Sequence, residues 1–157
     1  MNERILRSGL AWVVLAGIVG SSTLAAPIKP PENPARITVS VVPEMVSPGG
    51  SAEITLTLEP ISGVKINRYP QIKLQVPGQE GLVAEAEVRI GSKTPLPLED
   101  GANFWKKVDP VGLTLRIDDA AASGEHEIEA KLTYYYCLSG NFCAPKRVPL
   151  TISLDVE

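Results

Sequence analysis

The sequence predicts an all-β fold, either a sandwich or a barrel, from three observations. From Arg36 onward, apolar and polar residues alternate with the period of two that is typical of half-buried strands. Glycine and proline interrupt this alternation at short intervals, as turns between strands do. The chain shows no convincing helical periodicity and no internal repeat. We therefore expect one domain built from short strands.

The predicted strands follow one another along the chain. Residues 36–42, RITVSVV, alternate, and residues 51–58 place Ile54, Leu56 and Leu58 on one face after a Pro-Gly-Gly turn. The remaining strands are expected at 63–69, 71–76, 83–90, 113–117, 126–136 and 147–156.

Residues 92–105, SKTPLPLEDGANFW, break the rhythm of strands and turns. Such a segment is either a surface crossover or a lid, because long loops in compact domains are often functional.

The N-terminus has the pattern of a secretory signal peptide. Arg4 and Arg7 precede the apolar stretch 10–19, LAWVVLAGIV, and small residues follow it. The apolar run is shorter than the ~20 residues of a membrane-spanning helix. We expect cleavage after Ala25, a proline-rich linker over 26–35 and a domain over 36–157, exported to a bacterial periplasm. We also expect a monomer.

Composition narrows the classes of partner. Without residues 1–25 the chain has 13 basic and 17 acidic residues, a net charge of −4. No basic patch is evident, which argues against nucleic acid as a partner. About 130 residues are enough for a domain with its own core, so disulfides are not needed to compensate for a small core.

Both cysteines, Cys137 and Cys143, lie near the C-terminus in the segment 133–147, TYYYCLSGNFCAPKR. If 126–136 and 147–156 form a hairpin, the alternation places both sulfurs on the polar outer side rather than in the core. A disulfide there closes a loop of about seven residues, which the chain-entropy estimate values at ~2.4 kcal/mol.

Two interpretations of this pair stay open on the residues alone. Lys146 and Arg147 follow Cys143, and nearby positive charge stabilises a thiolate, which favours a redox couple. The tyrosines at 134–136 and Phe142 would then shield the sulfurs or form a docking surface. The alternative is a purely structural hairpin disulfide of the kind common in secreted proteins.

The segment LTYYYCLSGNFCAPKRVPLTISL resembles the end of the N-terminal periplasmic domain of the thiol:disulfide interchange protein DsbD. The matching positions are Thr133, Tyr134, Cys137, Phe142, Cys143, Pro145, Val148, Pro149 and Leu150. Residues 63–77, GVKINRYPQIKLQVP, are similar to the mid-domain strand pair of that family. The resemblance covers about residues 35–157.

The resemblance implies an immunoglobulin-like β-sandwich and a redox function. In this family the dithiol form reduces disulfides of periplasmic client proteins, and a thioredoxin-like domain served by a membrane electron carrier reduces it again. Cys143 matches the cysteine that exchanges with partners, and Cys137 matches the one that resolves the mixed disulfide. The resemblance implies no cofactor. Because this chain ends at Glu157, the reductant and carrier are expected to be separate polypeptides.

The sequence also departs from the family. Lys65 and Asn67 replace the tyrosines of its mid-domain strand. The family's cap loop, which carries an aromatic residue over the disulfide, would fall near residues 92–105, with Phe104 or Trp105 as the shielding residue.

Three other functions compete with the redox interpretation. An exported binding domain with a structural disulfide is the main one. A Cu(I) site on the two cysteines would have only His126 and Met45 as further soft ligands. A hydrolase is disfavoured because the only histidine, His126, lies between two glutamates and no nucleophile arrangement is legible.

Overall fold

The computed structural model describes residues 29–97, 101–139 and 142–157, and every regular element in these ranges is a strand. The predicted signal peptide, residues 1–25, lies outside the described residues, as do the first three residues of the predicted linker. No helix in the described part of the chain has the length and apolar character that crossing a membrane requires.

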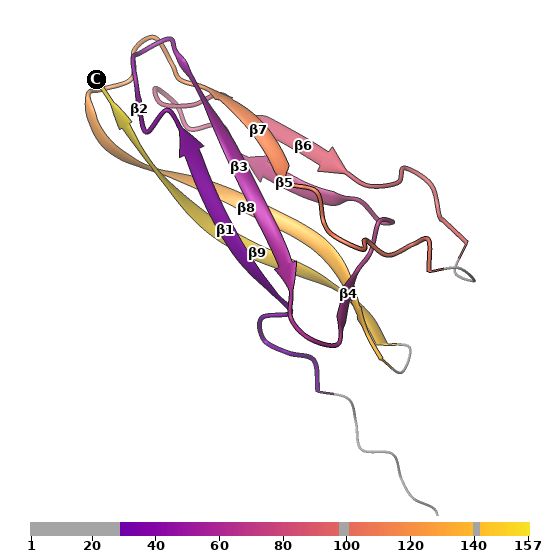
Figure 1. The fold of residues 1–157 in the computed structure, drawn as a ribbon. Helices are drawn as coiled ribbons and strands as arrows, with labels where there is room; N and C mark the ends of the chain where they lie inside the picture. The colour runs from indigo at the N-terminus through magenta and orange to yellow at the C-terminus, as the bar shows by residue number, and fades with distance from the viewer. Residues whose placement is uncertain (1–28, 98–100, 140–141) are drawn as a thin grey trace, which may run out of the picture.

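Two sheets face each other (Figure 1). The smaller sheet has the order β1-β3-β7, with β1 at Ala35–Val42, β3 at Ser51–Pro60 and β7 at Val111–Arg116. The larger has the order β2-β9-β8-β5-β6, and β4 joins it by pairing with β8. Its strands are β2 (Met45–Val46), β4 (Val64–Ile66), β5 (Ile72–Val76), β6 (Ala86–Ile90), β8 (Gly124–Leu138) and β9 (Phe142–Val156).

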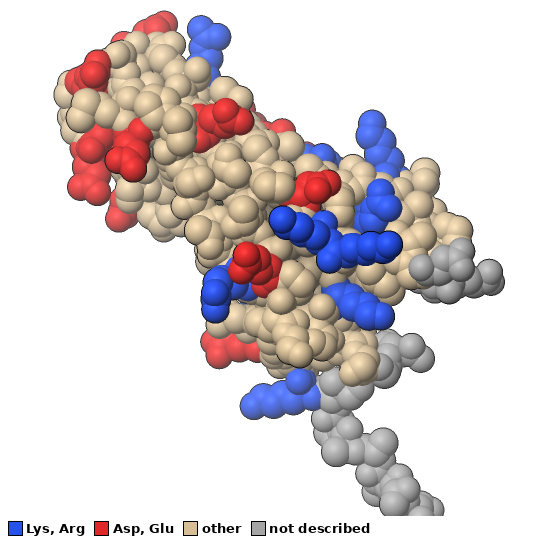
Figure 2. Space-filling view, in the orientation of Figure 1, with Lys and Arg blue, Asp and Glu red and all other residues tan. Residues whose placement is uncertain are grey.

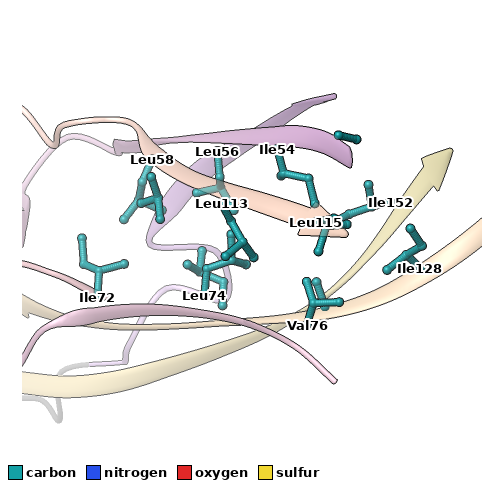
Figure 3. Packing of buried hydrophobic residues seen from close by; sticks show 14 of the residues in the cluster. Ile54, Leu56, Leu58, Ile72, Leu74, Val76, Leu113, Leu115, Ile128 and Ile152 are labelled. Atoms are coloured by element: carbon teal, nitrogen blue, oxygen red, sulfur yellow. The ribbon is translucent and has the colours of Figure 1, made fainter. Parts of the chain in front are cut away.

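The core lies between the two sheets. Ile54 and Leu56 of β3 point toward Leu74 of β5 and Ile128 of β8, as Figure 3 shows. All four side chains are fully buried. Because successive residues of a strand point to opposite faces, the same strands turn polar residues outward, and the predicted immunoglobulin-like β-sandwich is confirmed.

The long hairpin β8–β9 organises the larger sheet. Fifteen residues of β8 pair in antiparallel register with fifteen of β9, from Gly124 opposite Val156 to Leu138 opposite Phe142. The other edge of β8 is shared, because β5 pairs with residues 131–133 and β4 with residues 136–138. The tip of the hairpin therefore lies beside β4, at the end of the molecule opposite the C-terminus (Figure 1).

Each predicted strand has a counterpart in the structure. The hairpin strands extend further toward the tip than expected, to Leu138 and from Phe142. The sequence pattern missed β2, because its two residues are too few to show an alternation. β2 pairs with the end of β9 in parallel orientation.

Candidate functional site

The tip of the β8–β9 hairpin carries a disulfide. Cys137 and Cys143 lie directly opposite each other in the register, with their Cα atoms 4.0 Å apart, and their sulfurs are bonded. The hairpin geometry expected from the sequence therefore brings the two cysteines together as a cross-strand pair. Neither a redox nor a structural role follows from the bond alone.

The two cysteines differ sharply in exposure. Cys143 is exposed, whereas only 5% of Cys137 is accessible to solvent. The prediction that both lie on the outer side is correct for the phase of the alternation, because Thr133, Tyr135 and Cys137 are in step along β8. The outer side is not open to solvent at both cysteines, however, because neighbouring segments cover Cys137.

The cover over Cys137 comes first from β4 and the residue that follows it. Lys65 of β4 is the cross-strand neighbour of Cys137 on the side away from Cys143. Asn67, itself only 7% exposed, places its Oδ1 atom 3.3 Å from Sγ of Cys137. The Nδ2 atom of Asn67 donates to the carbonyl oxygen of Tyr69. A polar amide thus lies against the buried sulfur.

The segment 92–105 is attached to this side of the sheet at both ends, through Arg68. The amide of Ser92 donates to the carbonyl oxygen of Arg68, and the amide of Arg68 donates to the carbonyl oxygen of Asn103. Gly91 makes the first attachment possible, because its φ is +111° and a Cβ atom there would lie 2.3 Å from the Arg68 oxygen. Both ends of this loop therefore lie next to Arg68, which directly follows Asn67 in the sequence.

The two aromatic residues at the end of this loop have different surroundings. Phe104 forms a bridge with Asn67, and Lys65 Nζ lies 5.2 Å from the centre of the Phe104 ring. Trp105 packs against the hydrophobic core instead. Of the two residues expected to shield the disulfide, Phe104 is therefore the one beside the residues that cover Cys137.

The aromatic residues of the hairpin divide between the two faces. Tyr134, Tyr136 and Phe142 form a series on the inner side, with ring centres 6.5 and 6.3 Å apart. Burial raises the pKa of Tyr134 to about 12, and Tyr136 adds to the shift; no described residue accepts a hydrogen bond from the Tyr134 hydroxyl. Tyr135 alone shares the outer phase with Cys137. Of the four aromatic residues expected to shield the sulfurs or to form a docking surface, three therefore lie on the other face of the sheet.

Neither of the two basic residues after Cys143 is adjacent to the disulfide in the register of the sheet. Lys146 is out of phase with Cys143, and its Nζ donates to the carbonyl oxygen of Glu32. Arg147 is in phase with Cys143 but four residues along the strand, ~13 Å away. The cationic side chain adjacent in register to the disulfide is Lys65, which lies far from the cysteines in the sequence.

The candidate ligands for a soft metal are spread along the sheet. His126 lies eleven residues before Cys137 on the same strand, a separation of ~36 Å. Its Nε2 atom is 2.7 Å from the carbonyl oxygen of Ala122. Met45 lies on β2, which pairs with the opposite end of β9 from Cys143. Neither residue can share a metal ion with the cysteines.

The chemistry that this arrangement supports is thiol–disulfide exchange at one sulfur. In such an exchange an incoming thiolate would attack the exposed Cys143, and Cys137, next to the amide of Asn67, would be the leaving group. The sequence predicted both cysteines as residues of the site, but neither Lys65 nor Asn67. The sequence signal at these two positions was that they carry lysine and asparagine where the family has tyrosines.

Comparison with known proteins identifies no family for this chain. No family model matches this chain, and no curated protein matches it. Among solved structures, that of murine CRIg is similar to 78% of this chain over 98% of its own length, at 14% sequence identity and a TM-score of 0.35. The function of this chain has to be inferred from the site itself.

Proposed function

We propose that this chain is an exported thiol:disulfide interchange module like the N-terminal domain of DsbD. Its Cys137–Cys143 couple would pass electrons between a thioredoxin-fold reductant and periplasmic client disulfides. A separate membrane electron carrier would supply the reductant. The observation that carries the proposal is the unequal exposure of the two sulfur-bearing residues, 5% for Cys137 against an exposed Cys143.

Unequal exposure matters because exchange requires one sulfur to be attacked and the other to leave. A thiolate of the reductant attacks Sγ of Cys143, forms a mixed disulfide and releases Cys137 as a thiolate. The second thiol of the reductant then attacks its own first sulfur, and Cys143 leaves. The reductant ends as a disulfide, and this chain holds two electrons and, after protonation, two thiols.

The reverse sequence delivers these electrons to a client. The Cys143 thiolate attacks the client disulfide, one client sulfur leaves, and Cys137 attacks Cys143 to release the second. Oδ1 of Asn67 is placed to accept a hydrogen bond from the Cys137 thiol, so the resolving thiol is held beside its partner between turnovers.

Trapping the mixed disulfide tests this proposal. In an exporting host, Cys137→Ser should accumulate an adduct between Cys143 and a thioredoxin-fold protein, visible on non-reducing gels and identifiable by mass spectrometry. Cys143→Ser is the matched control, since its remaining thiol is buried and should give no adduct. If Cys137→Ser gives no thiol-sensitive adduct, or both variants give the same one, the alternative of an exported binding domain with a structural disulfide is favoured.

A further inference from the structure

A basic hollow lies on the outer face of the larger sheet. It has a volume of about 440 Å³ and is formed mainly by polar and charged side chains of β5, β6, β8 and β9 and of the loop after β6. The basic side chains that line it are Lys73, Arg89, Lys93, Lys131 and Arg147. The chain as a whole has a net charge of −3, so this concentration of positive charge is local.

The hollow arises from the register of four strands. Arg89 on β6 is opposite Lys73 on β5, Lys73 is opposite Thr133 on β8, and Thr133 is opposite Arg147 on β9. Directly opposite residues lie about 5 Å apart, and like charges at that spacing destabilise a sheet. The prediction that the chain has no basic patch is wrong, because these residues lie far apart in the sequence and come together only in the sheet.

Among the residues that the structure describes, only Glu87 neutralises part of this charge. Glu87 accepts a hydrogen bond from Arg89, which lowers the pKa of that carboxyl, and it lies 4.0 Å from Lys73. No carboxylate of residues 29–97, 101–139 or 142–157 forms an ion pair with Lys93, Lys131 or Arg147. The arrangement is compatible with folding but favours an anionic partner.

The position of the hollow connects it with the disulfide. Tyr135 lines the hollow and precedes Cys137 by two residues on the same face, ~7 Å along the strand. Arg147 and Cys143 share the outer face of β9 with only Pro145 between them in that phase. A protein that brings a thiol to Cys143 from this face therefore covers the hollow.

The charges of the outer face would also orient such a partner. On β8, beyond Lys131, the exposed outer residues are Glu129, Glu127 and Glu125. The opposite face of the molecule shows a similar separation, with most acidic side chains near the C-terminal end and most basic ones over the other half (Figure 2). An acidic partner is attracted to the half that carries the disulfide and repelled by the other.

We propose that the basic hollow docks an acidic surface of the thiol-bearing protein that exchanges with Cys143. This inference rests on the proposed function, because it names the kind of partner surface used at the same disulfide. The occupant is a carboxylate-rich protein segment adjoining a reactive cysteine.

Charged thiol peptides test the proposal on the intact oxidised protein. Three six-residue peptides each carry one cysteine and three aspartates, three serines or three lysines. We expect the acidic peptide to reduce the wild-type disulfide about tenfold faster than the serine peptide at low salt, with the lysine peptide slowest and the differences shrinking as salt is raised.

Charge-reversing substitutions test whether the faster reduction by the acidic peptide arises at the basic hollow. Lys131→Glu with Arg147→Glu should abolish the advantage of the acidic peptide over the serine peptide. The matched control is Arg36→Glu with Arg116→Glu, which makes the same change in net charge on exposed positions of the other sheet and should keep the advantage. Equal and measurable rates of reduction by all three peptides on the wild type, or equal losses of the advantage in both double variants, would overturn the proposal.

A binding measurement separates this proposal from the redox function. A fluorescent acidic peptide with serine in place of cysteine should bind the wild type and the control variant, but not Lys131→Glu with Arg147→Glu, in anisotropy titrations. That result, with no reduction by any peptide, would refute the exchange function and leave the docking surface supported. Absence of binding together with equal rates refutes the docking surface. Tighter binding of a dT12 oligonucleotide than of the peptide would assign the hollow to nucleic acid and also refute it.

Discussion

The two ends of the β8–β9 hairpin have the same alternation but different surroundings. At the end near the C-terminus, Glu125 and Glu127 face Asp155 and Ser153 on the outer side, and all four are exposed. At the tip, the outer position Cys137 is almost fully buried. The inner side is buried at both ends, at Ile128 and at Tyr134.

The difference shows that alternation assigns a residue to a face, whereas the neighbouring strands determine whether that face is covered. At the tip, β4 and the segment that ends at Trp105 extend the sheet beside β8, and Asn67 contacts the sulfur of Cys137. β4 and β5 pair only with residues 131–138 of β8, so the other end has no such neighbour. The disulfide therefore has one covered and one open residue.

The largest expected effect is on the free energy of unfolding and comes from a core substitution at the end of the β8–β9 hairpin near the C-terminus. Ile128→Ala removes a fully buried side chain and should lower the free energy of unfolding by about 2–5 kcal/mol, measured by urea denaturation. The rate at which dithiothreitol reduces the disulfide of the folded protein should not change, because Ile128 is nine residues from Cys137 along β8. A changed reduction rate would show that the two ends are not independent.

Removal of the disulfide has a smaller expected effect. Cys137→Ala with Cys143→Ala should cost ~2.4 kcal/mol in urea denaturation, because the bond closes only a short loop. Ser153→Ala, an exposed outer position at the other end, is the control and should change stability by less than about 0.5 kcal/mol. A loss above about 4 kcal/mol would make the disulfide a main support of the fold and weaken the redox interpretation.

The smallest effect concerns Tyr134, beneath the tip, and depends on pH. Its pKa is about 12 in the folded protein and 10.0 ordinarily, so between these values the unfolded chain loses a proton that the folded chain keeps. Stability from this group is intact below pH 10 and is lost as the pH rises, by about 1 kcal/mol at pH 11. Tyr134→Phe should abolish that loss, measured by urea denaturation at pH 7 and pH 11.

Tyr135→Phe is the control for this pH dependence, since Tyr135 is only partly buried and should leave the alkaline loss in place. At pH 7 Tyr134→Phe should be at least as stable as the wild type, because the Tyr134 hydroxyl has no acceptor among the described residues. An alkaline loss that persists in Tyr134→Phe would contradict the assignment to this tyrosine.

Much of the fold could be predicted from local pattern. The period of two located all the strands long enough to show it, and it placed Ile54, Leu56 and Leu58 correctly on the buried face of β3. It also predicted the hairpin that pairs Cys137 with Cys143. The pattern could not reveal β2, nor where the long loop attaches, because backbone hydrogen bonds such as that from Arg68 to Asn103 carry no signature in side-chain type.

Side-chain alternation along single strands, together with one hairpin, is enough to predict the all-β class, the buried face of each strand and the pairing of the two cysteines. It leaves open the choice between sandwich and barrel, the cover over Cys137 beside an exposed Cys143, and the hollow lined by Lys73, Arg89 and Arg147. The physical reason is that exposure and local charge depend on which strands are neighbours across a sheet. Long-range packing, rather than any one segment, fixes those neighbours.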